Sequence, residues 1–268
     1  MIIGSATLRL IAKNEARLPV SHGRLLHAAL LDIIRDRDPE LSAFMHNSDV
    51  NNFSVALLKV SAPVANYSYT IKPGVTAYWR IGIIGSRLLN LLWTLPKGIE
   101  VRVGAVVFLV EAIFKKETKD SELSRIDTEE LEQRIFEIPA RKSLTIKFLS
   151  PTTFSGTTGD YPFPLPKIIF GPLADRWNSF SDSTTFDVRN VKEISEYLIP
   201  RRWEGRSCVY NISQNLSIPS FIGSFTYDLC RLPPEYRGIL IILAEFGKYA
   251  GVGRHTGQGM GRIEVEYE

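Results

Sequence analysis

The fold of the first half is determined by SATLRLIAK at residues 5–13 followed by SHGRLLHAALLDIIR at residues 21–35. In the first segment apolar residues occupy every second position, as in a strand with one buried face. In the second they recur every three to four positions, Ser21 is a suitable N-cap, and Asp38-Pro39 stops the pattern. A strand followed by an amphipathic helix is therefore predicted.

The rest of the first half completes a β-α-β-β-α-β order. Residues 53–60 and 75–84 have strand composition, and turn signals flank the second of them. Ser86 caps a helix through residue 95, and residues 99–114 form a long stretch rich in valine and phenylalanine. This order builds a four-stranded antiparallel sheet with both helices on one face, the ferredoxin-like arrangement.

The second half repeats this order without a repeat at the level of residues. We expect a domain at 1–120, a charged helical linker at 121–140 with a helix over 127–134, and a domain at 141–268. In the second domain we expect strands around 144–148, 206–212, 221–230 and 260–267, helices at 172–180, 191–198 and 234–249, and a loop at 151–166. The predicted fold class is α+β, with two tandem ferredoxin-like (RRM-like) domains. Many unrelated proteins share this fold, so it does not assign function.

Composition excludes several classes of protein. The chain has 268 residues, is 44% hydrophobic and carries 32 Lys and Arg against 29 Asp and Glu, so it can bury a core and permits an anionic partner. Two cysteines, Cys208 and Cys230, cannot build a disulfide framework and indicate a reducing, cytoplasmic interior. The longest apolar runs, at 105–110 and 239–244, are far too short to span a bilayer, and the N-terminal residues lack the apolar run of a signal peptide.

The most unusual local feature is a glycine-rich loop at residues 251–261, GVGRHTGQGMG, which has five glycines in eleven residues. Such spacing lets backbone N–H groups approach an anion closely, and it equally suits a tight turn that needs positive φ. Arg254 and His255 favour an anion-binding role. The loop is neither a Rossmann fingerprint nor a Walker loop, and we expect no cofactor.

Four histidines are present: His22, His27, His46 and His255. The sequence contains no H-E-x-x-H motif and no paired C-x-x-C, so we expect no metal site. His27 lies at the border of the apolar stripe of the first helix, three residues after Arg24, so both side chains can face one side.

Three blocks of sequence resemble the CRISPR repeat-processing endoribonucleases, the Cas six family of RAMP proteins. They are PVSHGRLLHAALL from residue 19, continued by DPEL at 38–41 and FMH at 44–46; FLSPTTF at 148–154; and AGVGRHTGQGMGR at 250–262. The blocks lie near both ends and in the middle, so the resemblance spans nearly the whole chain.

The resemblance implies a metal-independent ribonuclease that binds CRISPR repeat RNA and cleaves precursor crRNA. The ribose 2′-hydroxyl would attack the adjacent phosphate and leave a 2′,3′-cyclic phosphate, which requires a base, an acid and positive charge. His46 matches the catalytic histidine of the family and would be the base, His27 would be the acid or orient the phosphate, and Arg24 would stabilise charge. Leu31 and Asn52 stand where many relatives carry a tyrosine and a lysine.

The expected RNA contacts lie beside the first helix, in or near the glycine-rich loop, or in tandem basic positions: Arg35, Arg201, Arg202, Lys248, Gly251, Gly253, Arg254, His255, Gly257 and Gly259. Two alternatives stay open: a RAMP-type protein that binds repeat RNA without cutting it, and an enzyme acting on a small phosphorylated ligand at the glycine-rich loop. Also open are membership of a CRISPR effector complex and homodimerisation.

Overall fold

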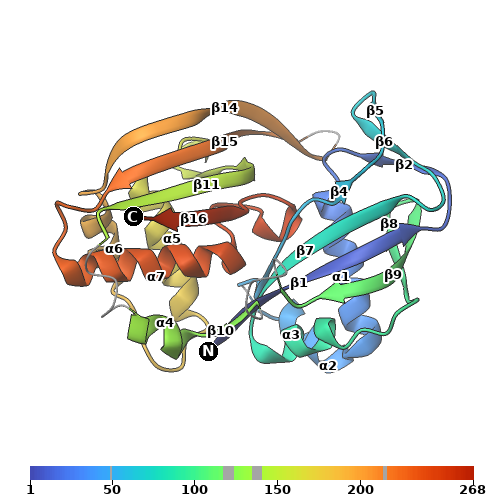
Figure 1. Ribbon diagram of the computed structural model, residues 1–268, viewed down its shortest axis with the longest axis horizontal. Helices are drawn as coiled ribbons and strands as arrows, with labels where there is room; N and C mark the ends of the chain where they lie inside the picture. The colour runs from blue at the N-terminus through green and yellow to red at the C-terminus, as the bar shows by residue number, and fades with distance from the viewer. Residues whose placement is uncertain (49, 117–123, 135–140, 214–215) are drawn as a thin grey trace.

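The computed structural model describes residues 1–48, 50–116, 124–134, 141–213 and 216–268. Two lobes lie side by side, each a sheet with helices on one face (Figure 1). The first half of the chain forms the lobe on the right of the figure, and the second half forms the lobe on the left.

The N-terminal sheet is built around β1 (Ile2–Ala12), which pairs with β7 (Thr76–Ile84) on one side and β9 (Val106–Phe114) on the other. The strand order is β3-β7-β1-β9-β8, and all of these pairs are antiparallel. In the β-α-β-β-α-β motif β1, β3, β7 and β9 are the first, second, third and fourth strands. Their order in the sheet is that of the ferredoxin-like fold.

Helices α1 (Gly23–Arg37) and α3 (Ser86–Trp93) cover one face of this sheet. The apolar stripe predicted for the first helix is buried against the alternating apolar residues of β1. The predicted strand at 99–114 is instead a hairpin, β8 (Glu100–Val103) and β9, because the chain reverses at Gly104, where φ is +62°. The predicted strand at 53–60 is two short strands, β3 (Phe53–Val55) and β4 (Lys59–Val60), both paired with β7.

A helix that sequence reasoning missed, α2 (Pro39–His46), follows α1 directly. Asp38 ends α1 and caps α2 by accepting a hydrogen bond from the backbone N–H of Leu41 at 3.0 Å. Proline suits the first turn of a helix, so Pro39 both stops α1 and starts α2. Two hydrogen bonds from Arg87, at 2.6 and 2.7 Å, hold the pKa of Asp38 below its usual value. This corner places His46 at the last residue of α2.

The remaining strands of the N-terminal lobe form a small sheet in the order β2-β6-β5. They are β2 (Ala16–Pro19), β5 (Val64–Ala65) and β6 (Ser68–Ile71).

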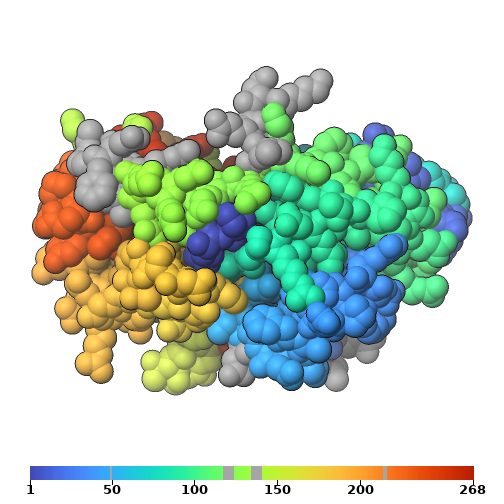
Figure 2. All heavy atoms as spheres, turned by 90° about the horizontal axis from the view of Figure 1, so that it is seen from below, coloured from blue at the N-terminus to red at the C-terminus, as the bar shows by residue number. Residues whose placement is uncertain are grey.

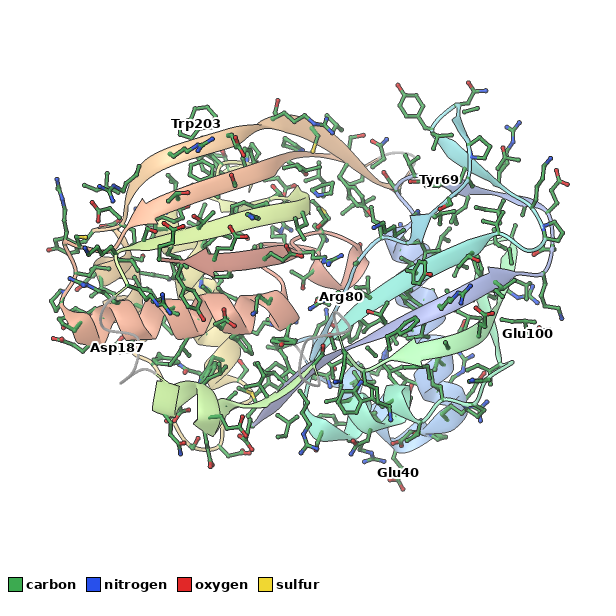
Figure 3. All side chains as sticks on the ribbon, in the orientation of Figure 1. Glu40, Tyr69, Arg80, Glu100, Asp187 and Trp203 are labelled. Atoms are coloured by element: carbon green, nitrogen blue, oxygen red, sulfur yellow. The ribbon has the colours of Figure 1, made fainter. Side chains whose placement is uncertain are left out.

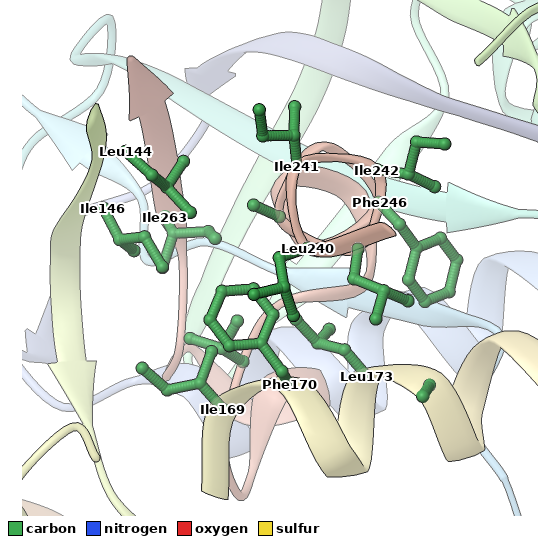
Figure 4. Close-up of a cluster of buried hydrophobic side chains, with 14 of the residues drawn as sticks. Leu144, Ile146, Ile169, Phe170, Leu173, Leu240, Ile241, Ile242, Phe246 and Ile263 are labelled. Carbon is green, nitrogen blue, oxygen red and sulfur yellow. The ribbon is translucent and has the colours of Figure 1, made fainter. Parts of the chain in front are cut away.

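The C-terminal sheet repeats the same topology with the order β14-β15-β11-β16. Its strands are β11 (Ser143–Thr152), β14 (Ile199–Ser213), β15 (Leu216–Asp228) and β16 (Ile263–Tyr267). Helices α5 (Pro166–Asn178), α6 (Val188–Ser195) and α7 (Pro234–Ala250) pack beside it. Figure 4 shows the resulting core, in which side chains of β11 and β16 meet those of α5 and α7. The prediction of two tandem ferredoxin-like domains is confirmed.

Several details of this lobe differ from expectation, and one is that β14 begins at Ile199 rather than at residue 206. Helix α5 begins at Pro166, six residues before the predicted start at residue 172, and Pro172 lies inside it. The predicted loop at 151–166 contains a small hairpin of β12 (Phe154–Gly156) and β13 (Gly159–Tyr161). A short 3-10 helix, η2 (Thr256–Gln258), lies within the glycine-rich loop.

The two lobes are joined by packing as well as by the chain. Within the predicted linker, β10 (Arg125–Asp127) pairs with β1, and α4 (Thr128–Arg134) follows it; residues 121–123 and 135–140 lie outside the described part. Ile3 and Ile84 of the N-terminal sheet belong to the C-terminal core, and Ser54 donates a hydrogen bond to the Tyr249 carbonyl at 2.7 Å. Seen from below in Figure 2, the lobes meet along a broad seam. Among the described helices, none is long and apolar enough to cross a membrane.

Candidate active site

A pocket of about 610 Å³ lies between α1 and α2, and we call it the histidine pocket. Its lining includes His27, Leu31 and Arg35 from α1, His46 from the end of α2, and Asn51 and Phe53 at the start of β3. The structure thus brings together the two histidines proposed for catalysis, which are 19 positions apart in the chain. It also places Leu31, which stands where many relatives carry a tyrosine, on the wall of this pocket.

The ring of His27 is held in place from two sides. Its Nδ1 lies 3.0 Å from the carbonyl oxygen of Gly257, and its ring centroid is 5.4 Å from that of Phe53. A carbonyl oxygen only accepts hydrogen bonds, so Nδ1 carries the proton in this contact. In the neutral ring the lone pair is therefore on Nε2, and that nitrogen is the one available for proton transfer.

His46 is exposed at the end of its helix, and none of the described residues forms a hydrogen bond with its side chain. It can therefore reorient toward a bound substrate without breaking a contact. The two histidines thus differ in preorganisation: His27 is fixed and His46 is free.

Two arginines of α1 line different cavities. Arg35 lines the histidine pocket, 63% exposed, and forms ion pairs with Asp32 at 2.8 Å and Asp36 at 3.5 Å. Arg24 instead lines a cavity of about 770 Å³ between the lobes, which we call the interlobe cavity. Its walls include Tyr67 from the N-terminal lobe and Ile212 from the C-terminal lobe. The structure therefore separates Arg24 from His27, although they are three residues apart.

The glycine-rich loop is mostly buried against both lobes. Gly251, Gly253 and Gly259 have φ values of +74°, +75° and +89°, the left-handed region that favours glycine. A Cβ at Gly253 would lie 2.1 Å from the Thr153 carbonyl oxygen, which also accepts a hydrogen bond from the Arg254 N–H at 2.8 Å. These features match the tight-turn interpretation. The loop contacts the histidine pocket through the hydrogen bond from His27 to the carbonyl of Gly257.

The charged residues of this region are already paired. Arg254 donates to Asp160 at 2.7 Å, and Lys248 is bound to Glu245 at 2.6 Å. His255 has a left-handed backbone, φ +57°, and burial is the main cause that lowers its pKa. Arg254 and His255 lie in the loop and Lys248 lies just before it, and none of the three is in the described lining of the histidine pocket.

Arg201 and Arg202 lie on the outer strand β14, next to an exposed tryptophan. Trp203, labelled on β14 in Figure 3, is 59% exposed. It stacks on Phe225, with ring centroids 6.0 Å apart and planes inclined by 15°. Arg202 lies 3.6 Å from Glu204, and Arg201 lies 3.7 Å from Asp228. This strand thus carries cations and an aromatic ring on the surface.

His22 has a structural role. It is buried, its Nδ1 donates to the Pro19 carbonyl at 2.8 Å, and its Nε2 accepts the Leu58 N–H at 2.9 Å. Burial lowers the pKa of His22, so the ring is neutral near pH 7. Both nitrogens are engaged, which leaves none for chemistry.

Sequence reasoning missed two residues that join the glycine-rich loop to the rest of the site. The Tyr210 hydroxyl donates to the Gln258 carbonyl at 2.9 Å and accepts the Gly23 N–H at 3.2 Å, and burial raises its pKa to about 12. Arg176 of α5 donates to oxygens of both lobes. Its signal in the sequence is a cation directly before the buried Trp177 on an otherwise apolar helix face.

The described residues contain no group of three or more His, Cys, Asp or Glu side chains placed to hold a metal ion. The histidine pocket is lined by two imidazoles, those of His27 and His46, and by the guanidinium of Arg35. Imidazoles move protons near neutral pH, and a guanidinium stabilises anionic oxygen.

Comparisons with known proteins agree with this fold. The family description "CRISPR Cas6 N-terminal domain" matches residues 4–106, and "CRISPR-associated endoribonuclease Cas6" matches residues 146–263. A curated relative, the CRISPR-associated endoribonuclease Cas6 of Mycobacterium tuberculosis, is 22% identical over 97% of this chain and 76% of its own length.

Solved structures resemble almost the whole chain. The product complex of Cas6 (TTHA0078) has a TM-score of 0.74 at 25% identity and covers 99% of this chain and 100% of its own. A structure described as an RAMP protein binding different RNA substrates has a TM-score of 0.63 at 15% identity, covering 98% and 99%. The fold is that of RAMP proteins built from two ferredoxin-like domains. With both of its domains matched, the chain belongs to the Cas6 family of CRISPR-associated endoribonucleases.

Proposed function

We propose that this protein binds CRISPR repeat RNA and cleaves precursor crRNA without a metal ion, through attack of a ribose 2′-hydroxyl on the adjacent phosphate. The observation that carries the proposal is the presence of His27 and His46 on one pocket of about 610 Å³. A pocket of this size accommodates a nucleotide unit. One imidazole can accept a proton while the other donates one.

In this mechanism His46 takes the proton from the 2′-hydroxyl. The 2′-oxygen forms a bond to phosphorus, the bond from phosphorus to the 5′-oxygen breaks, and His27 donates a proton to that leaving oxygen. The products are a 2′,3′-cyclic phosphate and a 5′-hydroxyl. The carbonyl of Gly257 supports His27 as the acid, because Nδ1–H donates to it in both the neutral and the protonated ring, while Nε2–H faces substrate.

Positive charge for the transition state comes from Arg35, which lines the same pocket. Its partners Asp32 and Asp36 are exposed residues of the same helix, so a phosphate can displace them at small cost. The family resemblance predicts this role for Arg24, but Arg24 lines the interlobe cavity, and we propose that it binds RNA there. Phosphates that extend beyond the cleaved nucleotide would pass from one cavity to the other along α1.

The mechanism is tested by incubating purified protein with repeat RNA in excess EDTA. We expect cleavage at one site and a 2′,3′-cyclic phosphate end, whereas a 2′-deoxy substitution at the attacked ribose should block cleavage and leave binding intact. Strict dependence on Mg²⁺ or Mn²⁺ would contradict the mechanism. Binding without cleavage, with or without divalent ions, would favour the alternative of a repeat-binding RAMP protein.

A second RNA contact is proposed on β14. The inner face of Trp203 is supported by Phe225, so its exposed face can stack on an unpaired base while Arg201 and Arg202 contact phosphates. Stacking on an aromatic side chain contributes about 1–3 kcal/mol per base, so Trp203→Ala should weaken RNA binding about tenfold. Tyr197→Ala is the control, since Tyr197 is 62% exposed and has no ring contact among the described residues. Equal affinities for the two variants would refute this contact.

We retain the remaining predicted RNA contacts as proposals. Arg254 and Lys248 can reach phosphates by exchanging their carboxylate partners, and His255 adjoins Arg254. The loop glycines, Gly251, Gly253, Gly257 and Gly259, are proposed to act mainly by shaping the loop that supports His27.

A further inference from the structure

Arg176 is a cation held by neutral oxygens of both lobes. Its Nη2 donates to the carbonyls of Asn51 at 2.6 Å and Phe53 at 3.0 Å in the N-terminal lobe. Its Nη1 donates to the Ala250 carbonyl at 2.5 Å and to the Thr256 hydroxyl at 3.1 Å. Ala250 directly precedes the glycine-rich loop, and Thr256 lies in the middle of it. One guanidinium therefore joins β3 to the loop.

This arrangement is unusual because the charge lacks a carboxylate partner. Among the described residues, no Asp or Glu forms an ion pair with Arg176, and its Nε is shut off from solvent without an acceptor. Burial lowers the pKa of Arg176 to about 10, which still leaves it protonated near neutral pH. Removing a charge from water without a counter-ion is unfavourable, so simple packing is better served by an apolar residue. An apolar residue would lack the planar set of N–H donors with which the guanidinium binds these four oxygens.

The segments that Arg176 holds are the same ones that restrain His27. Phe53, whose carbonyl it binds, packs its ring against the His27 ring. Thr256, whose hydroxyl it binds, precedes Gly257, whose carbonyl meets His27 Nδ1. An added Cβ at Gly257 would lie 3.2 Å from His27 Nδ1 and 3.3 Å from Phe53 Cε2, so the three groups are in close contact.

We propose that Arg176 is a positioning residue for RNA cleavage, which fixes Phe53 and Thr256 so that the His27 imidazole stays aimed into the histidine pocket. The inference rests on the proposed function, because it gives Arg176 a role only through the proton transfer by His27. It assigns part of the catalytic geometry of the N-terminal lobe to a side chain of the C-terminal lobe.

The test is a double-mutant cycle between Arg176 and His27, measured as the single-turnover cleavage rate at saturating repeat RNA. Arg176→Met should lower the rate about 10²-fold, the scale of loss for a misplaced catalytic group. Arg176→Lys should be nearly as slow, because a single ammonium group cannot bind the acceptors of both lobes at once. In the His27→Ala background, Arg176→Met should cause no further loss. Affinity for 2′-deoxy repeat RNA should change little in any variant.

Two more measurements separate positioning from stability. Arg237→Met is the matched control, since Arg237 also donates to backbone carbonyls, Leu232 at 2.7 Å and Cys230 at 3.2 Å, but lies at the start of α7. It should lower the melting temperature without changing the saturated rate. Millimolar guanidinium should partly restore cleavage to Arg176→Ala and leave Arg237→Ala unchanged.

Several outcomes would overturn the inference. A loss from Arg176→Met that is equally large with and without His27, or a lowered melting temperature with a wild-type rate, means that Arg176 is only structural. If the methionine variant does not fold, the same cycle is run with Arg176→Lys, and additive losses there reject the inference. A wild-type protein that does not cleave repeat RNA, or a His27→Ala variant that cleaves at the wild-type rate, instead refutes the proposed function.

Discussion

The histidine pocket and the interlobe cavity, which both lie along α1, differ in which parts of the chain build them. The described lining of the histidine pocket comes from the N-terminal lobe alone and includes two imidazoles and Arg35. The larger interlobe cavity needs both lobes, and its described lining includes Arg24 but no histidine. The two histidines that we propose transfer protons are thus gathered by one helical corner, while the interlobe cavity, which we propose binds RNA, forms only when the lobes dock.

The separation is incomplete, since the C-terminal lobe still reaches His27 through the Gly257 carbonyl. A histidine from the first lobe is therefore oriented by a backbone oxygen of the second. The proposed function therefore predicts that docking of the lobes affects both cleavage and RNA binding, and substitutions in the two cavities should separate these effects.

The largest effect should follow from removing the free histidine. His46→Ala should lower the cleavage rate by about 10²–10⁴-fold, because positioned proton transfer contributes that much, and should preserve RNA affinity. His46→Gln should be as inactive, since an amide cannot take the proton. Single-turnover rates and filter binding measure the two quantities.

The pH dependence of the same reaction tests the pairing of the histidines. The rate should be bell-shaped, because one imidazole must be neutral while the other is protonated, and His27→Ala should remove one limb. A wild-type rate for His46→Ala would reject this assignment of the site. His255 would then be the remaining candidate, because both nitrogens of His22 are engaged.

The next effect compares Arg24 with Arg35, two of the arginines of α1. Arg35→Ala should reduce the saturated cleavage rate roughly 10–100-fold, through lost stabilisation of the transition-state charge, with little change in affinity. Arg24→Ala should weaken affinity several-fold, reduce its salt dependence and leave the saturated rate near the wild-type value. The reverse pattern would show that the RNA is cleaved at the interlobe cavity and bound at the histidine pocket.

A smaller effect concerns two glycines of the same loop. Gly257→Ala introduces no positive-φ strain but presses on His27 and Phe53, so it should lower cleavage roughly tenfold with a small change in melting temperature. Gly253→Ala forces a left-handed residue against the Thr153 carbonyl, so it should lower the melting temperature by several degrees. Equal melting temperatures and equal rates for the two variants would contradict this division.

The smallest effect is a pH dependence of stability from His22. Burial lowers the pKa of His22 below 6.5, so the unfolded chain takes up this proton at a higher pH than the folded one. Its contribution is fully present above about pH 6.5 and is lost as pH falls, with a slope of at most about 1.4 kcal/mol per pH unit. Urea unfolding at several pH values should show this slope in the wild type and its absence in His22→Leu, which is less stable overall. An unchanged slope would mean that another group titrates.

The sequence by itself determined the topology of both lobes. The alternation of residues 5–13, the helical period of residues 21–35 and the repeated element order sufficed, because burying one face of a strand or helix imposes its period on the chain. The family resemblance likewise selected His27 and His46, and both lie on one pocket. Local signals failed at Pro39, because this one residue both ends a helix and begins the next. They also failed at Gly104, where a run of strand-like composition turns back on itself as a hairpin.

Tertiary structure alone decided how the site is assembled. The contact of His27 with Gly257 spans 230 positions, and its acceptor is a backbone carbonyl, which every residue possesses. The same holds for Arg176, which binds the carbonyls of Asn51 and Phe53, just before and at the start of β3. It also holds for Arg24, which lines a cavity that exists only between docked lobes. Main-chain oxygens carry no sequence signal, and the docking of two lobes depends on the summed shape of their surfaces. The residue types in the sequence indicated the candidate reacting groups, and tertiary packing determined which of them lie close together.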